Sequence, residues 1–134
     1  MLPIPFTERM QKMLGEEYEA FEASYALEKK QALRFNPLKG DKEAFLEKVP
    51  FSLSKVEWSE NGYYYEKEDA PGKHPYHEAG IYYIQEPSAQ TPAQLLEARP
   101  GEKVLDLCSA PGGKATQIAG AMNGEGLLVC NEYV

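Results

Sequence analysis

One stretch, residues 106–114 with the sequence DLCSAPGGK, constrains the fold more than any other part of the chain. A short apolar run, 103–107, leads into it, and small residues and helix formers follow over 115–122. This pattern predicts a buried strand, a glycine turn and a helix, and then a second buried strand over 127–130. Such an order of elements is typical of an α/β fold, because parallel strands are connected by helices.

The glycine turn predicts a ligand site at the start of the helix. A helix N-terminus presents unpaired N–H groups and a partial positive charge, and Gly112 and Gly113 let a ligand approach the backbone because they lack a Cβ atom. Glu132 follows the second predicted strand, roughly twenty residues past the glycines, where nucleotide-binding units carry an acidic residue that accepts ribose hydroxyls. We therefore expect a nucleoside-containing cofactor, with a purely connecting glycine turn as the simpler alternative.

The turn differs from the common phosphate-binding motifs. Cys108 stands where a P-loop has its first glycine, Ala115 follows the lysine in place of Ser or Thr, and the G-x-G-x-x-G spacing is missing. The stretch closely resembles the S-adenosyl-L-methionine turn of the Sun-type RNA cytosine-5 methyltransferases, which include bacterial ribosomal RNA enzymes of the RsmF and RsmB kind. By this resemblance, the residues expected to bind S-adenosyl-L-methionine are Cys108, Ser109, Ala110, Pro111, Gly112, Gly113, Lys114 and Glu132.

The first half of the chain predicts a helical pair followed by a small α+β module. The helical pair carries an apolar stripe with three- and four-residue spacing, which we expect to lie in the core. An Asn-Gly pair between β-forming residues predicts a hairpin. The stripe consists of Met10, Leu14, Tyr18, Phe21 and Tyr25. The predicted elements are helices over 7–14, 16–27, 41–48 and 91–98, strands over 32–36 and 81–84, and a hairpin of strands 56–58 and 63–65.

A second segment, residues 76–90, also resembles these methyltransferases, which carry a similar Gln-Glu/Asp-Pro-Ser sequence before the cofactor strand. Arg34 and Asn36 are similar to an Arg-x-Asn strand that opens the RNA-presenting part of the enzymes. The resemblance implies an α/β fold: the start of a Rossmann-like S-adenosylmethionine-dependent methyltransferase domain preceded by a small α+β N-terminal domain. We place an RNA-positioning domain at residues 1–70 and the incomplete beginning of the methyltransferase domain at 71–134.

The resemblance also implies methylation of cytosine at carbon 5 in RNA, most often ribosomal RNA. In these enzymes a cysteine thiolate adds to the ring and a second cysteine helps to release the product. Both lie in later Pro-Cys and Thr-Cys motifs, and the chain ends at Val134 before either. We therefore expect an N-terminal fragment that is inactive alone. Cys108 is expected to lie beside the cofactor without acting as nucleophile, and Cys130 to be a small core residue.

Two other functions remain open. A ribose-directed RNA methyltransferase also uses Asp-Leu-x-x-Ala-Pro-Gly-Gly, but an aromatic residue commonly follows its glycines, and Lys114 fits the cytosine class better. A non-catalytic RNA-binding accessory protein would carry the turn without the later cysteines. The complete reading frame would decide on the accessory protein by the presence or absence of those cysteines.

Composition limits the partners and the compartment. The net charge of -7 argues against RNA binding by this stretch alone, because phosphate neutralisation requires a basic surface. Two cysteines without ligand spacing predict neither a disulfide framework nor a zinc site. The chain shows no membrane-spanning apolar run and no signal-peptide pattern. We expect a cytoplasmic monomer that binds RNA, with no metal and no membrane contact.

Overall fold

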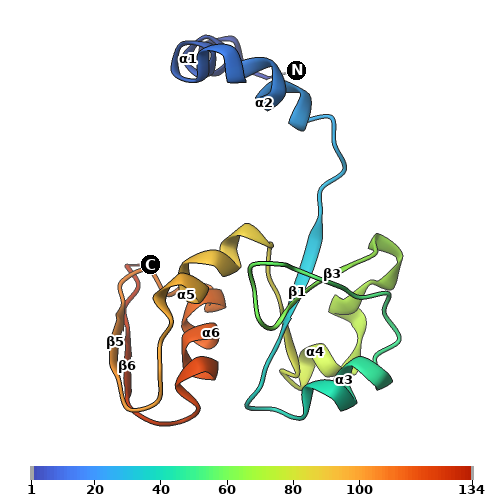
Figure 1. The fold of residues 1–134 in the computed structure, drawn as a ribbon, viewed down its shortest axis with the longest axis vertical. Coiled ribbons are helices and arrows are strands. Elements are labelled where there is room, and N and C mark those ends of the chain that lie inside the picture. Colours follow the sequence, from blue (N-terminus) through green and yellow to red (C-terminus); the bar gives the residue numbers. More distant parts are fainter. Residues whose placement is uncertain (1, 134) are drawn as a thin grey trace.

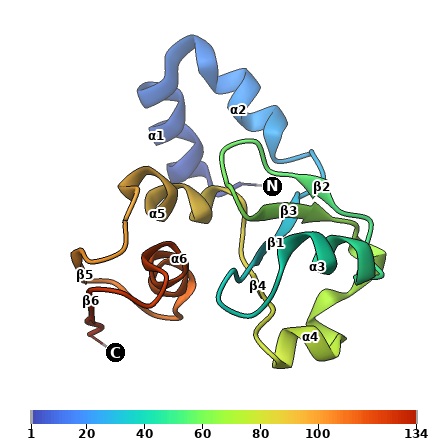
Figure 2. The same cartoon turned by 60° about the horizontal axis from the view of Figure 1, so that its bottom comes forward.

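The structure, a computed structural model, describes residues 2–133. Its strands are β1 (Gln31–Phe35), β2 (Ser54–Lys55), β3 (Gly62–Tyr65), β4 (Tyr82–Ile84), β5 (Lys103–Asp106) and β6 (Leu127–Cys130). In this part of the chain they form an antiparallel sheet in the order β2-β3-β1-β4 and a parallel pair, β5-β6. Helix α6 (Gly113–Met122) lies between the two sheets (Figures 1 and 2). The mixed α/β character predicted from the sequence is confirmed.

Strand β1 lies at the centre of the first sheet and carries much of its core. Leu33 and Phe35 are buried, and helix α3 (Lys42–Lys48) brings the ring of Phe45 to a centroid distance of 5.0 Å from that of Phe35. Asp41 caps α3 as predicted, because its Oδ1 accepts the N–H of Ala44 at 2.9 Å. The short helix α4 (Pro75–Glu78) precedes β4. The buried core cluster consists of Leu33, Phe35, Phe45, Val49, Tyr63 and Tyr82.

The predicted hairpin is displaced along the chain. The first strand occupies Ser54–Lys55 and not residues 56–58, which belong to a loop. Two tight turns shape this loop: the N–H of Ser59 donates to the Val56 carbonyl, and the N–H of Gly62 donates to the Ser59 carbonyl. Val56 and Ser59 are buried, so burial of the loop and not β-propensity determines the local backbone.

The N-terminal helices are α1 (Ile4–Leu14) and α2 (Tyr18–Ser24), joined by a short 3-10 turn. The first begins at Ile4 and not near Thr7, with a proline in its first turn, a position that proline favours. Figure 1 shows the pair set apart from both sheets at the end of an extended connector.

The apolar stripe on this pair is not part of the sheet core. Of its predicted members only Tyr18 is buried, and Tyr25 is 56% exposed. The ring centroid of Phe6 on α1 lies 6.2 Å from that of Phe21 on α2, so this face of α2 contacts the other helix. Within α2, the ring centroid of Tyr18 lies 6.3 Å from that of Phe21. The prediction that the stripe lies in the core is therefore wrong apart from Tyr18, because amphipathic spacing does not specify which surface a helix contacts.

The second sheet is covered on one face only. Helices α5 (Thr91–Leu96) and α6 pack against the face that carries Val104 and Leu128. The other face is exposed, although continuous apolar strands are typical of sheets that are buried on both faces. Its exposed side chains are Leu105, Leu107, Leu127 and Val129.

The boundary predicted at residue 70 stays a prediction. Strand β4 lies beyond that boundary, yet it pairs with β1 in the first sheet, where Tyr83 stands opposite Arg34. The pairing favours a later division between the two parts of the chain.

Candidate cofactor site

The parallel pairing of β5 with β6 brings the predicted turn and Glu132 together. Both strands end at the same edge of the sheet, so the residues that follow them meet. Ser109 donates to the Asn131 carbonyl through its N–H at 3.1 Å and through its hydroxyl at 2.9 Å. The N–H of Ala110 donates to Oε2 of Glu132 at 2.9 Å. The acidic residue therefore contacts the turn directly, and its predicted role as acceptor of ribose hydroxyls stays a prediction.

Asp106 forms the base of the turn and was not among the residues predicted to bind a cofactor. It is 8% exposed, and its Oδ1 accepts the N–H of Cys108 at 3.0 Å. Its Oδ2 is buried and has no hydrogen-bond partner within residues 2–133. A buried carboxylate oxygen without a partner is costly. The turn thus contains an acceptor that residues 2–133 leave without a donor.

Gly112 and Gly113 are needed for different reasons. Gly112 has a φ of 109°, which residues with a Cβ rarely adopt, and a Cβ there would meet only open space and a Thr116 methyl group at 4.0 Å. At Gly113, a Cβ would lie 3.1 Å from Nε2 of Gln85 and 3.5 Å from the ring of Tyr83. Gly112 is required by its backbone conformation, whereas Gly113 is required by close packing against residues of the N-terminal part of the chain.

The start of α6 supplies unpaired donors beside Glu132. Gly112 is the N-cap residue, no side chain caps the helix, and the N–H of Thr116 donates to the Gly112 carbonyl at 2.9 Å. The N–H groups of Gly113, Lys114 and Ala115 therefore lack acceptors within the helix. Together with the helix dipole they favour an anionic or oxygen-rich ligand group.

Side chains from the first sheet hold the opposite side of the turn. The guanidinium of Arg34 donates to the Gly113 carbonyl at 3.1 Å and to Oγ1 of Thr116 at 2.8 Å. The hydroxyl of Tyr83 donates to the Pro111 carbonyl at 3.2 Å. The sequence placed Arg34 in an RNA-presenting strand, but the side chain is 4% exposed and points toward α6. Only the resemblance of segment 76–90 indicated that this region accompanies the turn.

Neither cysteine occupies the environment of an activated nucleophile. Cys108 and Cys130 are both exposed free thiols. The prediction that Cys130 is a core residue is wrong, because this last residue of β6 is exposed, although its backbone pairs with Asp106 of β5. Cys108 lies inside the turn, and its N–H is held by the Asp106 carboxylate. Within residues 2–133, no cluster of three or more His, Cys, Asp or Glu side chains could hold a metal ion.

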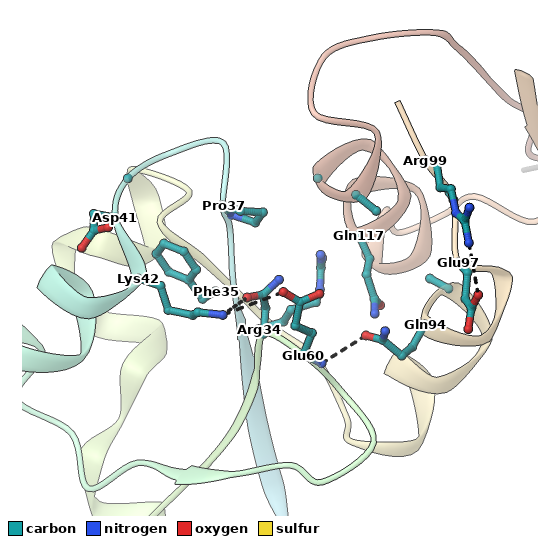
Figure 3. A pocket seen from close by; sticks show the side chains of 16 residues that line it. Arg34, Phe35, Pro37, Asp41, Lys42, Glu60, Gln94, Glu97, Arg99 and Gln117 are labelled. Atoms are coloured by element: carbon teal, nitrogen blue, oxygen red, sulfur yellow. Dashed lines mark hydrogen bonds and ion pairs between the residues drawn. The ribbon is translucent and has the colours of Figure 1, made fainter. Parts of the chain in front are cut away.

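One cavity adjoins the turn, and a second lies between the two parts of the chain. The first, of about 810 Å³, runs along β5 and α5 and reaches Cys108 and Lys114. Figure 3 shows the other, of about 570 Å³, between the first sheet and helices α5 and α6, lined among others by Lys42, Glu60 and Gln117. The second cavity contains side chains of both charges and no residue of the turn.

In the described part of the chain, no helix combines the length and the apolarity needed to cross a bilayer.

Comparison with known proteins places this geometry in one class, the RNA-modifying methyltransferases. Residues 2–87 match the family described as the N-terminal domain of 16S rRNA methyltransferase RsmF, and residues 93–133 match the family described as 16S rRNA methyltransferase RsmB/F. The chain therefore belongs to the RsmF family of 16S rRNA methyltransferases, and the family predicted from the sequence is confirmed. The predicted fold, an N-terminal domain followed by the start of a methyltransferase domain, is also confirmed.

Individual relatives agree with this assignment. Ribosomal RNA small subunit methyltransferase F of Vibrio campbellii is 38% identical over 98% of the chain, and that of Erwinia tasmaniensis is 34% identical over the same share. A methyltransferase homolog protein from Pyrococcus horikoshii, whose structure is solved, superposes with a TM-score of 0.81 at 28% identity over 96% of the chain and 44% of its own length. The chain spans about 30% of the length of the curated relatives.

Proposed function

We propose that the protein containing this chain methylates carbon 5 of cytosine in ribosomal RNA, with S-adenosyl-L-methionine as the methyl donor, and that residues 106–132 form half of its cofactor site. The contact between Glu132 and the turn at Ala110 is the observation that supports this proposal most. It places a carboxylate on the turn that leads into the unpaired N–H groups of α6, and a nucleoside with an attached amino acid requires both kinds of group.

The residues present fit this cofactor. The carboxylate of Glu132 would accept the ribose hydroxyls, and the backbone of Gly112, Gly113 and Lys114 would hold the methionine part. Oδ2 of Asp106, buried without a partner, can accept a hydrogen bond from a cationic amine. Ser109, Pro111 and the other turn residues would line the site. When bound, the cofactor supplies an electrophilic methyl group, and the chain's own residues orient it and shield it from water.

Cys108 is assigned no catalytic role. A nucleophile must approach the cytosine ring from the side opposite the methyl group, whereas Cys108 belongs to the turn that would hold the cofactor itself. The catalytic cysteines belong to later motifs of the family, and the 134-residue chain alone transfers no methyl group. Cys108→Ser in the complete enzyme should retain substantial turnover.

The N-terminal part would position the RNA in the cytoplasm, where ribosomal RNA is modified, and the protein would act as a monomer. We place the division between the two parts between β4 and α5, later than residue 70, because β4 pairs with β1. The net charge of -7 assigns much of the RNA-contacting surface to other parts of the enzyme.

Calorimetric titration of the complete protein with S-adenosyl-L-methionine tests the cofactor site. Charge-assisted hydrogen bonds contribute roughly 1.5–3 kcal/mol each, so Glu132→Ala should weaken binding by about tenfold or more, and Glu132→Asp should retain part of the affinity. Glu125→Ala, a loop residue just before β6, is the matched control. Wild-type affinity in Glu132→Ala would remove the carboxylate from the site.

A methyl-transfer assay on small-subunit RNA tests the reaction. Tritiated methyl incorporation should occur with the complete protein, and mass spectrometry of the digested RNA should find the label on the cytosine base. Label on the ribose oxygen would favour the ribose-directed alternative. Cofactor binding without any transfer, in a protein that lacks the later cysteines, would favour the accessory protein. Transfer by residues 1–134 alone would contradict the absence of a catalytic role for this part.

A further inference from the structure

Arg34 is an unusual residue for the middle of a sheet. It lies on the central strand β1, is 4% exposed, and forms no ion pair with any carboxylate of residues 2–133. Burial lowers the pKa of its guanidinium to about 10, and the nearby phenol of Tyr83 raises it slightly, so the group is charged at neutral pH. A buried cation without a counter-charge rarely benefits stability, because desolvation costs more than neutral partners return.

The neutral partners of Arg34 form a connected network. Its Nε donates to Oε1 of Gln85 at 2.9 Å, and Nε2 of Gln85 donates to the Ala89 carbonyl at 3.0 Å. The Gln85 amide is therefore fixed at both ends. The planar guanidinium in turn has a defined orientation, since its donors have a rigid geometry.

The other side of the guanidinium reaches the glycine turn. Its second nitrogen donates to the Gly113 carbonyl and to Oγ1 of Thr116, and that hydroxyl donates to the Gly112 carbonyl at 2.7 Å. Gly112 is the residue with the left-handed φ on which the turn depends. A continuous path of hydrogen bonds thus runs from strand β1 to the backbone of the turn.

We propose that Arg34 is a positioning residue that aligns the glycine turn for the cofactor from the N-terminal sheet, so that cofactor affinity depends on a side chain that does not contact the cofactor. This inference rests on the proposed cofactor site. Arg34 fixes the carbonyls of Gly112 and Gly113, and the N–H groups of the first turn of α6 follow the same backbone. Loss of the guanidinium lets the turn sample other conformations, which lowers the fraction that can bind.

The test combines three variants with one control in the complete protein. Arg34→Met removes the guanidinium donors and keeps an apolar side chain of similar length. Arg34→Lys keeps the positive charge but lacks the planar set of guanidinium N–H donors. Thr116→Val removes only the hydroxyl that Arg34 and the Gly112 carbonyl share. Arg99→Met is the control, because Arg99 is exposed and, among residues 2–133, its guanidinium forms an ion pair with Glu97 alone, at 4.0 Å. The measurements are S-adenosyl-L-methionine affinity by calorimetry, the amide NMR resonances of Gly112 and Gly113 without cofactor, and the thermal unfolding midpoint.

Arg34→Met should weaken cofactor binding by about tenfold or more, because a turn that holds the binding conformation for a tenth of the time or less raises the apparent Kd by that factor. The glycine resonances should shift or broaden, and the unfolding midpoint should fall little. Arg34→Lys should recover only part of the affinity, Thr116→Val should show a smaller loss of the same kind, and Arg99→Met should match wild type.

Results that differ from these expectations also decide for or against the proposal. Affinity within about twofold of wild type in folded Arg34→Met, or full recovery by Arg34→Lys, would overturn it. If Arg34→Met does not fold, Thr116→Val decides by the same two measurements. If wild type does not bind S-adenosyl-L-methionine, the proposed function fails, and the glycine resonances then decide separately whether Arg34 positions the turn.

Discussion

Replacing Gly126 by Ala tests the geometry that delivers Glu132 to the turn. Gly126 precedes β6, has a φ of 106°, and an added Cβ would lie 2.3 Å from the Glu102 carbonyl oxygen and 2.8 Å from Cε of Met122. The same carbonyl accepts the N–H of Leu127 at 2.9 Å, the contact next to the first β5–β6 pair. The carbonyl therefore cannot move without disturbing the register of the sheet.

The expected loss of stability has three parts. A left-handed φ costs about 1–2 kcal/mol once a Cβ is present. The displaced hydrogen bond from Leu127 to Glu102 contributes about 1 kcal/mol, and the repacking around Met122 about 1–3 kcal/mol. Gly126→Ala should thus destabilise the protein by about 3–6 kcal/mol. Gly124→Ala is a matched control, because Gly124 also has a positive φ of 78° but no atom within 4 Å of the added Cβ, so only the first part applies.

Urea unfolding of the two variants in the complete protein provides the measurement. The midpoint of Gly126→Ala should lie clearly below that of Gly124→Ala, and its cofactor affinity should fall because β6 carries Glu132. Equal midpoints for the two variants would refute the argument from the Glu102 carbonyl and would leave backbone strain as the only effect at both glycines.

Two further predictions concern buried and capping hydrogen bonds. Tyr82→Phe should lower the free energy of unfolding in urea by about 1–2 kcal/mol, because the Tyr82 hydroxyl donates to the Pro71 carbonyl at 2.7 Å. Burial of this hydroxyl also raises the pKa of Tyr82 to about 12. Tyr133, which is 96% exposed, is the control, and Tyr133→Phe should leave the free energy of unfolding unchanged. The hydroxyl of Ser88 holds the pKa of Glu86 below its ordinary value near 4.5. The stability that this contact contributes is present above pH 4.5 and is lost as the pH falls through the lowered pKa of Glu86. Ser88→Ala should therefore raise the pKa of Glu86 in an NMR titration and reduce the loss of folding stability at acidic pH.

The second half of the chain was predictable because its signals are local. The glycines, the apolar runs beside them and residues 123–126, which end helix α6, each determine the backbone over a few residues. Parallel pairing then requires the residues after both strands to meet. The contact of Glu132 with the turn follows from that rule. Asp106 was missed because its role depends on an unpartnered oxygen, which a sequence pattern does not reveal.

Other features depended on contacts between distant residues. The stripe of α1 and α2 has the correct spacing for a buried face, but spacing does not say whether that face meets a sheet or another helix. Val56 has high β-propensity, yet its burial and the turns around Ser59 make a loop. Arg34 lies in a sequence that resembles an RNA-presenting strand. Only the hydrogen-bond partners of its guanidinium show that the side chain points into the protein.

The contacts that join the two parts of the chain are largely polar, which has a consequence for how substitutions act. Arg34 and Tyr83 hold the turn, and Nε2 of Gln117 on α6 donates to the Gln90 carbonyl at 3.0 Å. Hydrogen bonds of this kind contribute little net stability but depend steeply on geometry. An apolar interface would tolerate small rotations of α6, whereas this one fixes its orientation. Changes in the first sheet should therefore affect the alignment of the cofactor turn before they affect the folding of either part.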